Sequence, residues 1–445
     1  MGMQQAPSIG TIASDIDKQH TARVVVIDQT APTEDSASGA IKRTILNGIE
    51  RENLLIVYGR HVPVSRLTIH AGLDPEYATR RTYRSIDSAV SIIRDFDPHL
   101  ILYRPLPESP MLHELACHLA FDEHMPIALW FMDDWPAHLK EHDKVLHDHL
   151  VTDIIRLCGM AQSCFAISPQ MAAVFRDRYG GPEYHVAHNG IDPRDWASLI
   201  KSPRRPGPVV FRYSGNLASN MTQDSILRLA HVISALARDG NPVALEVRTH
   251  RHWRHLKDKF SALPGVSFEQ ISQTQGEYRQ WLCDADVGVI GYNFDEITVR
   301  YTRFSFANKL PELLAAGLPI LAIGPLEIET IRYLKEHDLA ILASDPSSET
   351  LKTAVKHLAT NTALRETLAV RAAHHAQEFF AINRTRAKMW HVINSAATTR
   401  AKGKSDAVDL MTKARPGFWG RVTETLYADF ISILFRLNNF LFKPK

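Results

Sequence analysis

The sequence predicts an α/β protein in which two doubly wound sheets, each covered by helices, face a cleft. Short apolar runs alternate with helical patterns along most of the chain, and a proline-rich interruption divides this series in two. A length of 445 residues is enough for about two or three domains. In such sheets a ligand binds beyond the carboxyl ends of the strands, which here means the cleft between the domains.

The first domain is expected over residues 23–192, after a disordered tail at 1–22. Its predicted strands are the apolar runs Val24–Ile27, Leu54–Val57, Leu100–Tyr103, Ile127–Phe131, Cys164–Ile167 and Tyr184–Ala187. Its predicted helices are Gly39–Ile49, Ile86–Asp95, Leu112–Phe121, Ala137–Leu157 and Pro169–Arg178. Strands that alternate with helices in this way predict a parallel sheet covered on both faces.

A linker at 193–207 carries several prolines and precedes the second domain, which is expected over 208–398 together with a crossing helix. The predicted strands here are Val209–Tyr213, Val243–Val247, Val287–Ile290 and the apolar run 320–323. A helix is predicted over Asp224–Ala237. The series therefore starts again with the same alternation as in the first domain.

The composition is that of an ordinary globular protein, with 45% hydrophobic and 22% charged residues. A formal net charge of +2 is too balanced to predict nucleic acid as a partner. The four cysteines form no CxxC pair, which predicts reduced, buried thiols. The first residues lack the apolar core of a signal peptide, and no apolar run is long enough to span a bilayer. We therefore expect a cytoplasmic protein, with membrane association as a further candidate property.

The stretch 305–322 is the most informative part of the chain. It predicts a loop, a short helix, a stop at Gly317 and a buried strand. Asn308, Lys309 and Glu312 are spaced to share one helix face. A cation and a carboxylate near a helix start suit a phosphorylated ligand that also carries hydroxyl groups. The alternative is an ordinary helix–strand unit with incidental polar residues.

This stretch resembles the donor-binding helix of GT-B glycosyltransferases, specifically glycosyltransferase family 4 and its relatives. The residues that match the pattern P-N-K-x-x-E-x-x-A-x-G-x-P are Asn308, Lys309, Glu312, Ala315, Gly317 and Pro319. Ala307 replaces the usual proline, and Phe304 stands where many members carry a second glutamate. The resemblance covers roughly residues 23–395 and implies two Rossmann-like domains, with Glu312 holding the ribose of a nucleotide sugar.

The turn Tyr213–Leu217 resembles the family's Y-x-G-R-L turn, whose arginine, with a lysine five residues later, clamps the donor diphosphate. Asn216 and Met221 occupy those two positions here. Another cation must therefore serve, and Lys309 is the first candidate, with Arg300 or Arg303 in reserve. The donor-binding residues that the resemblance implies are Gly215, Asn216, Arg303, Asn308, Lys309 and Glu312. The alternative is a weakened or lost donor site.

Acceptor-side residues are expected in the first domain. The segment His188–Asp192 resembles the P-N-G-V-D segment that closes this domain in family 4. Small residues around Ser38 and Gly39 resemble the family's Gly-Gly loop and would let the backbone approach an acceptor. Asp133 or Asp134, at the carboxyl end of a predicted strand, would position or deprotonate the acceptor hydroxyl. The alternative for these aspartates is the N-cap of a helix, and both roles can hold with different residues.

The resemblance thus implies a glycosyltransferase, in particular a hexosyltransferase, that moves a sugar from a nucleotide sugar to a glycan or lipid-linked acceptor in polysaccharide biosynthesis. Retention of anomeric configuration is implied, with Lys309 in place of a metal and no cofactor besides the nucleotide-sugar substrate. Two alternatives stay open: a sugar-nucleotide epimerase of the same fold, and a non-catalytic scaffold protein.

His113 and His118 are five residues apart, so they do not form the HExxH zinc motif.

The C-terminal part is predicted to hold a linker at 399–416 and an amphipathic helix at 417–445. Large apolar residues recur on one side of this helix, with lysines and arginines around them. This pattern favours a helix lying in a membrane surface, as a peripheral membrane enzyme with a lipid-linked acceptor would need. The alternatives are a helix docked on the protein body or a dimer contact.

Overall fold

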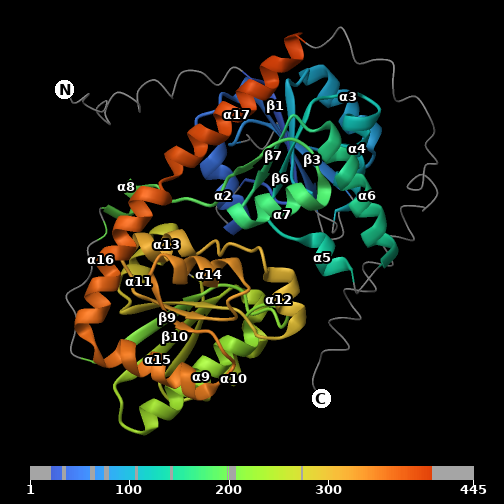
Figure 1. The fold of residues 1–445 in the computed structure, drawn as a ribbon. Helices are drawn as coiled ribbons and strands as arrows, with labels where there is room; N and C mark the ends of the chain where they lie inside the picture. The colour runs from blue at the N-terminus through green and yellow to red at the C-terminus, as the bar shows by residue number, and fades with distance from the viewer. Residues whose placement is uncertain are drawn as a thin grey trace, which may run out of the picture.

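The computed structural model describes residues 22–32, 37–60, 66–74, 80–105, 109–140, 144–197, 199, 207–271 and 274–402. Within these ranges the chain forms two α/β domains, the first above the second in Figure 1, each built on one sheet. The predicted N-terminal tail, apart from residue 22, lies outside the described residues. So does the predicted amphipathic helix at 417–445.

The first sheet has eight strands in the order β4-β3-β2-β1-β5-β6-β7-β8. The strands are β1 (Val24–Asp28), β2 (Leu54–Arg60), β3 (Arg66–Ala71), β4 (Arg81–Tyr83), β5 (Leu100–Tyr103), β6 (Ile127–Phe131), β7 (Ser163–Ala166) and β8 (Tyr184–Val186). Contrary to the expectation of a purely parallel sheet, β3 and β4 pair antiparallel. The reason is the short connection from β2 to β3, since a parallel return needs a crossover of a dozen or more residues.

Helices cover this sheet, and the central strands are buried along their whole length. The helices of the first domain are α2 (Ala37–Leu46), α3 (Ile86–Phe96), α4 (Pro110–Phe121), α5 (Trp135–Leu139), α6 (Lys144–Met160) and α7 (Pro169–Tyr179). The single helix predicted over Ala137–Leu157 is thus two helices. At α7, Ser168 caps the helix start through its Oγ, as the Ser-Pro junction indicates.

The second sheet has six parallel strands in the order β11-β10-β9-β12-β13-β14. The strands are β9 (Val209–Ser214), β10 (Val243–Thr249), β11 (Val266–Gln270), β12 (Val287–Gly291), β13 (Ile320–Ile323) and β14 (Ala340–Ala343). The strand order reverses between β9 and β12, and such a switch point opens a crevice for ligands at the strands' carboxyl ends. The edge strand β11 is mostly exposed, so it has no apolar run that could announce it in the sequence.

The helices of the second domain flank this sheet on both sides (Figure 1). They are α9 (Gln223–Arg238), α10 (Lys257–Ser261), α11 (Gln275–Cys283), α12 (Glu296–Thr302), α13 (Leu310–Ala315), α14 (Glu329–Glu336), α15 (Ser348–Thr360) and α16 (Thr362–Phe379). The strand β13 is fully buried, as predicted for the apolar run after Gly317. The helix α13 is shorter than the loop–helix pattern suggests, because it begins at Leu310, after Lys309.

The last described helix, α17 (Ile382–Lys402), returns from the second domain and lies along the first (Figure 1). The guanidinium of Arg386 donates to the carbonyl oxygen of Thr44 at 3.0 and 2.7 Å. The indole of Trp390 donates to the carbonyl oxygen of Ile45 at 3.1 Å. The chain leaves the first domain after α8 (Pro193–Ala197) and returns to it along α17.

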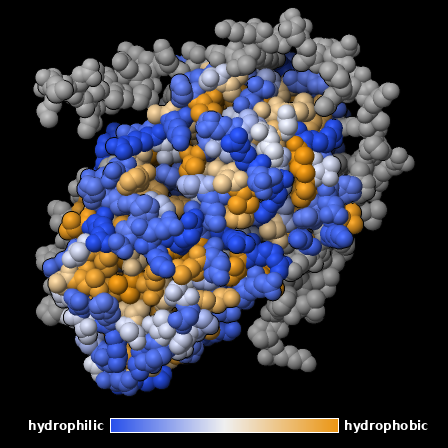
Figure 2. All heavy atoms as spheres, viewed as in Figure 1, coloured by the Kyte–Doolittle hydropathy of each residue, from blue (hydrophilic) through white to orange (hydrophobic). Residues whose placement is uncertain are grey.

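Aromatic side chains pack where the two domains meet. The rings of Phe175 on α7 and Phe304 lie 6.1 Å apart, and those of Trp135 and Tyr301 lie 5.6 Å apart. Hydrophilic side chains dominate the molecular face shown in Figure 2, with hydrophobic patches over both domains. No helix in the described ranges is long and apolar enough to cross a bilayer.

Protonation of His375 on α16 is expected to destabilise the protein in mild acid. Burial first, and then nearby His337 and His374, lower the pKa of His375 from 6.5 to about 4. Between these two values the unfolded chain binds more protons than the folded one, so the free energy of unfolding falls as the pH falls through that window. Melting temperatures measured across this range should decline.

A His375→Gln variant tests the assignment, because glutamine keeps a hydrogen-bonding group near the hydroxyl of Tyr333, which contacts His375 at 2.6 Å. The variant should lose stability at neutral pH but show a shallower decline between pH 6.5 and 4. An unchanged slope would assign the acid sensitivity to other groups.

Candidate functional site

The carboxyl end of β9 lies at the switch point of the second sheet and turns sharply at Gly215. The backbone there has a φ of +159°, and a Cβ on this residue would lie 3.0 Å from the hydroxyl oxygen of Tyr213. That hydroxyl group donates to the carbonyl oxygen of Asn216 at 2.5 Å, so it cannot move away freely. A glycine is therefore favoured at 215, and its backbone is fixed in place: its N–H donates to the carbonyl oxygen of Arg248 at 3.2 Å, and its carbonyl oxygen accepts from the Thr249 hydroxyl at 2.7 Å.

Three side chains converge beside this turn, Lys309, Glu312 and Tyr278, and Lys309 is close enough to Tyr213 for its charge to oppose the rise in the tyrosine's pKa that burial causes. The carboxylate oxygen Oε2 of Glu312 accepts from the Tyr278 hydroxyl at 3.0 Å and lies 3.2 Å from Nζ of Lys309. The ammonium group of Lys309 also lies 4.5 Å from the centre of the Tyr278 ring. Both polar contacts fall on one oxygen of Glu312, so its second oxygen is left for a ligand. Tyr278 comes from α11, and the other two come from the start of α13.

The charges of these three groups depend on one another. Burial alone lowers the pKa of Lys309, but Glu312 and Tyr278 outweigh burial and raise it, so the lysine is a permanent cation. Burial first, and then Glu312, raise the pKa of Tyr278 to about 12, so its hydroxyl keeps its proton and remains a donor. The cluster therefore presents one fixed positive charge and one carboxylate beside the turn at Gly215.

Asn216 and Met221, which replace the family's arginine and lysine, contact each other. The Asn216 amide nitrogen lies 3.7 Å from the Met221 sulfur. The Asn216 side-chain oxygen accepts from the backbone N–H of Ala218 and the hydroxyl of Thr222, each at 3.3 Å. The Asn216 side chain thus stabilises its own turn, and the positive charge beside this turn comes from Lys309.

Asn308 joins the second domain to the first. Its side-chain oxygen accepts a hydrogen bond from the amide nitrogen of Asn189, which lies in the segment His188–Asp192. Asn189 is 2% exposed. Both segments were singled out in the sequence for their family resemblance, and the structure brings them together. Asn308 therefore links the domains in this conformation, beside the residues expected to bind the donor.

Arg303 ends α12 and is exposed. Its guanidinium carbon lies 6.0 Å from the ring centre of Phe304, and its carbonyl oxygen accepts from the N–H of Glu329. Lys309, by contrast, lies within the cluster beside Gly215. Arg300 pairs with Glu296 on its own helix at 2.8 Å, so of the three cations considered from the sequence Lys309 is the best placed for a diphosphate at that turn.

In the first domain, a buried ion network lies at the switch point between β1 and β5. Asp28 ends β1, and its carboxylate lies 2.8 Å from Nζ of Lys42 and 3.8 Å from the guanidinium of Arg104, which follows β5. The side chains of Asp28 and Lys42 are 4% and 1% exposed. Burial lowers the pKa of Lys42 to about 8, although Asp28 opposes this shift. The pKa of Asp28 is lowered, because its two cations outweigh its own burial.

The same arginine positions Asp133, which follows β6. Arg104 donates from one nitrogen to Asp133 Oδ2 at 2.8 Å and from another to the Ser38 hydroxyl at 2.7 Å. The Asp133 side chain is 28% exposed. Its charge reaches the second domain, where burial first, and then Asp133, raise the pKa of Tyr292 to about 12. Ser38 and Gly39 lie in the first turn of α2, so the structure gathers the acceptor-side candidates at one edge of the sheet.

Asp134 has a different place from Asp133. It is 2% exposed, and its carboxylate caps α5 by accepting from the N–H of Ala137 at 3.2 Å. Both carboxylate oxygens also accept from Arg178, at 3.1 and 2.9 Å. Burial raises the pKa of Asp134, with Arg178 opposing the shift. The helix-cap alternative therefore describes Asp134, and Asp133 is the aspartate that faces the second domain.

Sequence reasoning did not single out four residues of these clusters: Tyr278, Asp28, Lys42 and Arg104. Asp28 and Arg104 directly follow predicted strands, so their place at the strands' carboxyl ends could have drawn attention to them. Tyr278 is 34 residues from Glu312, and no spacing rule connects the two. The described residues include one group that could hold a metal ion, His113 with Cys117 and Asp153 on α4 and α6.

Solved structures resemble the two-domain arrangement over most of its length. Sucrose-phosphate synthase from Thermosynechococcus elongatus has a TM-score of 0.61 at 11% identity, covering 84% of this chain and 99% of that one. Anabaena HepE in complex with UDP-glucose has a TM-score of 0.60 at 15% identity, covering 84% of this chain and 100% of the other. The trehalose 6-phosphate synthase of Burkholderia multivorans has a TM-score of 0.58 at 11% identity, over 86% of this chain and 98% of that one.

These neighbours are GT-B glycosyltransferases, and the chain has their fold: two Rossmann-like domains in series. The predicted fold class is thereby confirmed. No protein-family model matches the sequence, and no curated protein sequence registers as a relative. At identities of 15% or below, the structural likeness establishes the fold alone.

Proposed function

We propose that this protein is a glycosyltransferase resembling family 4, which moves a sugar from a nucleotide sugar to a hydroxyl group of a glycan or lipid-linked acceptor. Transfer proceeds with retention and without a metal at the site. One observation carries the proposal: Lys309, Glu312 and Tyr278 converge at the switch point of the second domain in a GT-B fold. Ligands bind at such switch points.

The donor is bound by complementary charges. The second oxygen of Glu312 accepts hydrogen bonds from the ribose hydroxyls, while Lys309 faces the diphosphate. Anabaena HepE, which has the same fold, was crystallised with UDP and with UDP-glucose, and this supports a nucleotide sugar as the ligand here. UDP-sugars are therefore the first donors to test.

The acceptor is bound by the first domain. Asp133 positions or deprotonates the acceptor hydroxyl, and Arg104 fixes its carboxylate by a charged hydrogen bond of 2.8 Å. The small residues Ser38 and Gly39 admit the acceptor close to the start of α2. Negative charge grows on the leaving diphosphate in the transition state, and Lys309 stabilises that charge. The aligned domains supply proximity and exclude water.

The decisive experiment incubates the protein with UDP-, GDP- and other nucleotide sugars, with and without membrane extract. Acceptor-dependent release of the nucleotide and a glycosylated product are expected. Interconverted sugars without an acceptor would show an epimerase instead, and the absence of any nucleotide-dependent rise in melting temperature would show a scaffold protein. Either result would overturn the proposal.

Alanine variants of the adjacent aspartates should separate chemistry from stability. Asp133→Ala is expected to slow transfer by about 10²-fold or more, the contribution typical of a general base, while Arg104 keeps Ser38 and Asp28 as partners. Asp134→Ala removes a helix cap and a buried charged hydrogen bond, which together cost about 2–3 kcal/mol of unfolding free energy. Steady-state rates and denaturant titrations of both variants measure the contrast. If both variants lost the same transfer rate and had the same free energy of unfolding, these two roles would be contradicted.

A further inference from the structure

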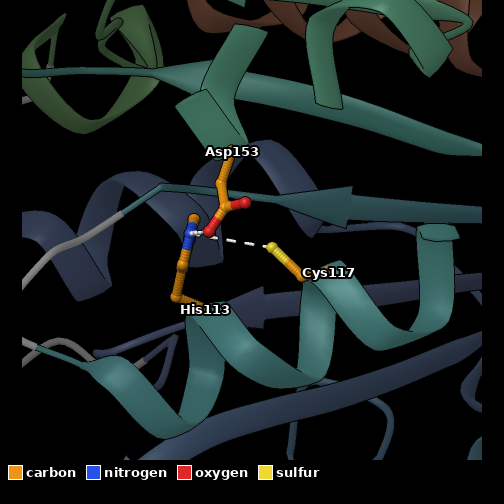
Figure 3. Close-up of side chains that lie close together, drawn as sticks. All are labelled: His113, Cys117 and Asp153. Atoms are coloured by element: carbon orange, nitrogen blue, oxygen red, sulfur yellow. Dashed lines mark hydrogen bonds and ion pairs between the residues drawn. The ribbon is translucent and has the colours of Figure 1, made fainter. Parts of the chain in front are cut away.

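A buried group of three side chains lies between α4 and α6, outside the proposed transfer site. His113 and Cys117 are one helical turn apart on α4, and Asp153 reaches them from α6 (Figure 3). His113 is 3% exposed, Cys117 is 6% exposed, and the Asp153 side chain is 19% exposed. Nothing in the proposed transfer reaction uses these residues.

Cys117 and Asp153 both approach the same ring nitrogen of His113. Asp153 Oδ2 lies 3.4 Å from His113 Nε2, and Cys117 Sγ lies 3.6 Å from it. The other ring nitrogen, Nδ1, is hydrogen-bonded to the Tyr103 hydroxyl at 2.8 Å. A Cys–His–Asp catalytic triad needs its two partners on different ring nitrogens. Three ligand atoms around one point are instead the arrangement of a metal site.

The distances agree with tetrahedral zinc coordination. With bonds of about 2.1 Å to nitrogen and oxygen and about 2.3 Å to sulfur, tetrahedral angles place N and O about 3.4 Å apart and N and S about 3.6 Å apart. These values equal the two separations measured from His113 Nε2. All three ligand atoms lie within 4.8 Å of one another. A small rotation of the partly exposed Asp153 carboxylate brings its Oδ2 to the tetrahedral separation from Cys117 Sγ.

Neighbouring side chains also hold two of the three ligands in position. The Tyr103 hydroxyl holds the ring orientation from the far side, as outer partners of metal-bound histidines do. Arg156 lies 4.0 Å from the other oxygen of Asp153, Oδ1, and leaves Oδ2 facing His113.

The geometry points to a Zn²⁺ site formed by His113 Nε2, Cys117 Sγ and Asp153 Oδ2, with water as the fourth ligand on the side where Asp153 meets solvent. Zinc binds the thiolate and the neutral imidazole, so its binding competes with protons and weakens as the pH falls. The ion joins α4 to α6 and thereby stabilises the first domain. None of its ligands belongs to the proposed transfer site, so the expected effect of the ion is on the stability of the first domain.

The test uses the full chain, stripped with a chelator and titrated with Co²⁺. A thiolate-to-cobalt charge-transfer absorption is expected to saturate at one ion per chain, and Zn²⁺ should abolish it and raise the melting temperature. Cys117→Ala should remove the absorption, whereas Cys283→Ala, which removes a buried thiol of the second domain, should retain it. His118→Gln should also retain the absorption. His118 lies on the same helix as His113 and beside two carboxylates, but it is more exposed and is not one of the proposed ligands.

Asp153→Asn keeps the shape of a partly exposed helix residue, so it tests the site even where Cys117→Ala folds poorly. It should weaken Co²⁺ binding more than about tenfold. Failure of the unaltered protein to develop the charge-transfer absorption would overturn the proposal and leave a buried His113–Asp153 ion pair. Full binding by Cys117→Ala would overturn it as well.

Discussion

Replacing Glu312 by glutamine is expected to reduce kcat/KM for sugar transfer by about 10²-fold or more, the effect of losing a charged hydrogen bond in a preorganised site. Glutamine has the same shape and can still accept from the Tyr278 hydroxyl, so the local packing is retained. In the proposed complex the ribose loses its carboxylate partner, and Lys309 loses the charge 3.2 Å away. Steady-state kinetics and nucleotide-induced shifts in melting temperature measure the loss.

Lys309→Met should act on a different step. It removes the cation that we propose faces the leaving diphosphate and nearly keeps the length of the side chain, so the decrease should fall mainly on kcat. Glu327→Gln is the matched control, because Glu327 is an exposed carboxylate of the same domain. Wild-type turnover in Glu312→Gln or Lys309→Met would refute the placement of the donor at this cluster.

The largest loss of stability is expected from Lys42→Met. The Lys42 side chain is 1% exposed and lies 2.8 Å from Asp28, so its removal leaves a buried carboxylate without its nearest cation. Breaking such a pair from one side costs about 3 kcal/mol or more of unfolding free energy. Arg104, 3.8 Å from the other oxygen of Asp28, keeps the loss near the lower end of that range. Denaturant unfolding at pH 7 measures it.

A double variant distinguishes a lost ion pair from lost packing. Adding Asp28→Asn to Lys42→Met removes the uncompensated charge, so the double variant should be more stable than Lys42→Met alone. If the two losses simply add, the carboxylate and the ammonium group do not interact in the folded protein, and the buried network at the end of β1 would need another explanation.

Much of the fold could be predicted from the sequence because its signals are local. Apolar runs such as Ile127–Phe131 are buried strands, and the proline-rich interruption separates two βα series. The antiparallel strands β3 and β4 and the edge strands β11 and β14 were not predicted. β11 is mostly exposed and has no apolar run, whereas the apolar run of β14 is only four residues long, and periodicity assigns such short runs poorly.

The candidate site divides in the same way. A spacing of three residues placed Lys309 and Glu312 on one face of the chain, and in the structure they form an ion pair. The sequence also singled out two adjacent aspartates, but only burial distinguishes them: Asp134 caps α5, while Asp133 faces the second domain. Adjacent side chains in an extended segment point to opposite sides, and the sequence does not show which side faces the cleft.

By itself, the sequence determined the two βα series, their division by a hinge, and the cation–carboxylate pair before Gly317, because each depends on residues a few positions apart. Only the tertiary structure decided which residues surround that pair and which residue of the first domain contacts the same segment. Tyr278 is 34 residues from Glu312, and Asn189 is 119 residues from Asn308. Contacts between such distant residues arise from the packing of whole sheets and domains, and periodicity along the chain does not encode them.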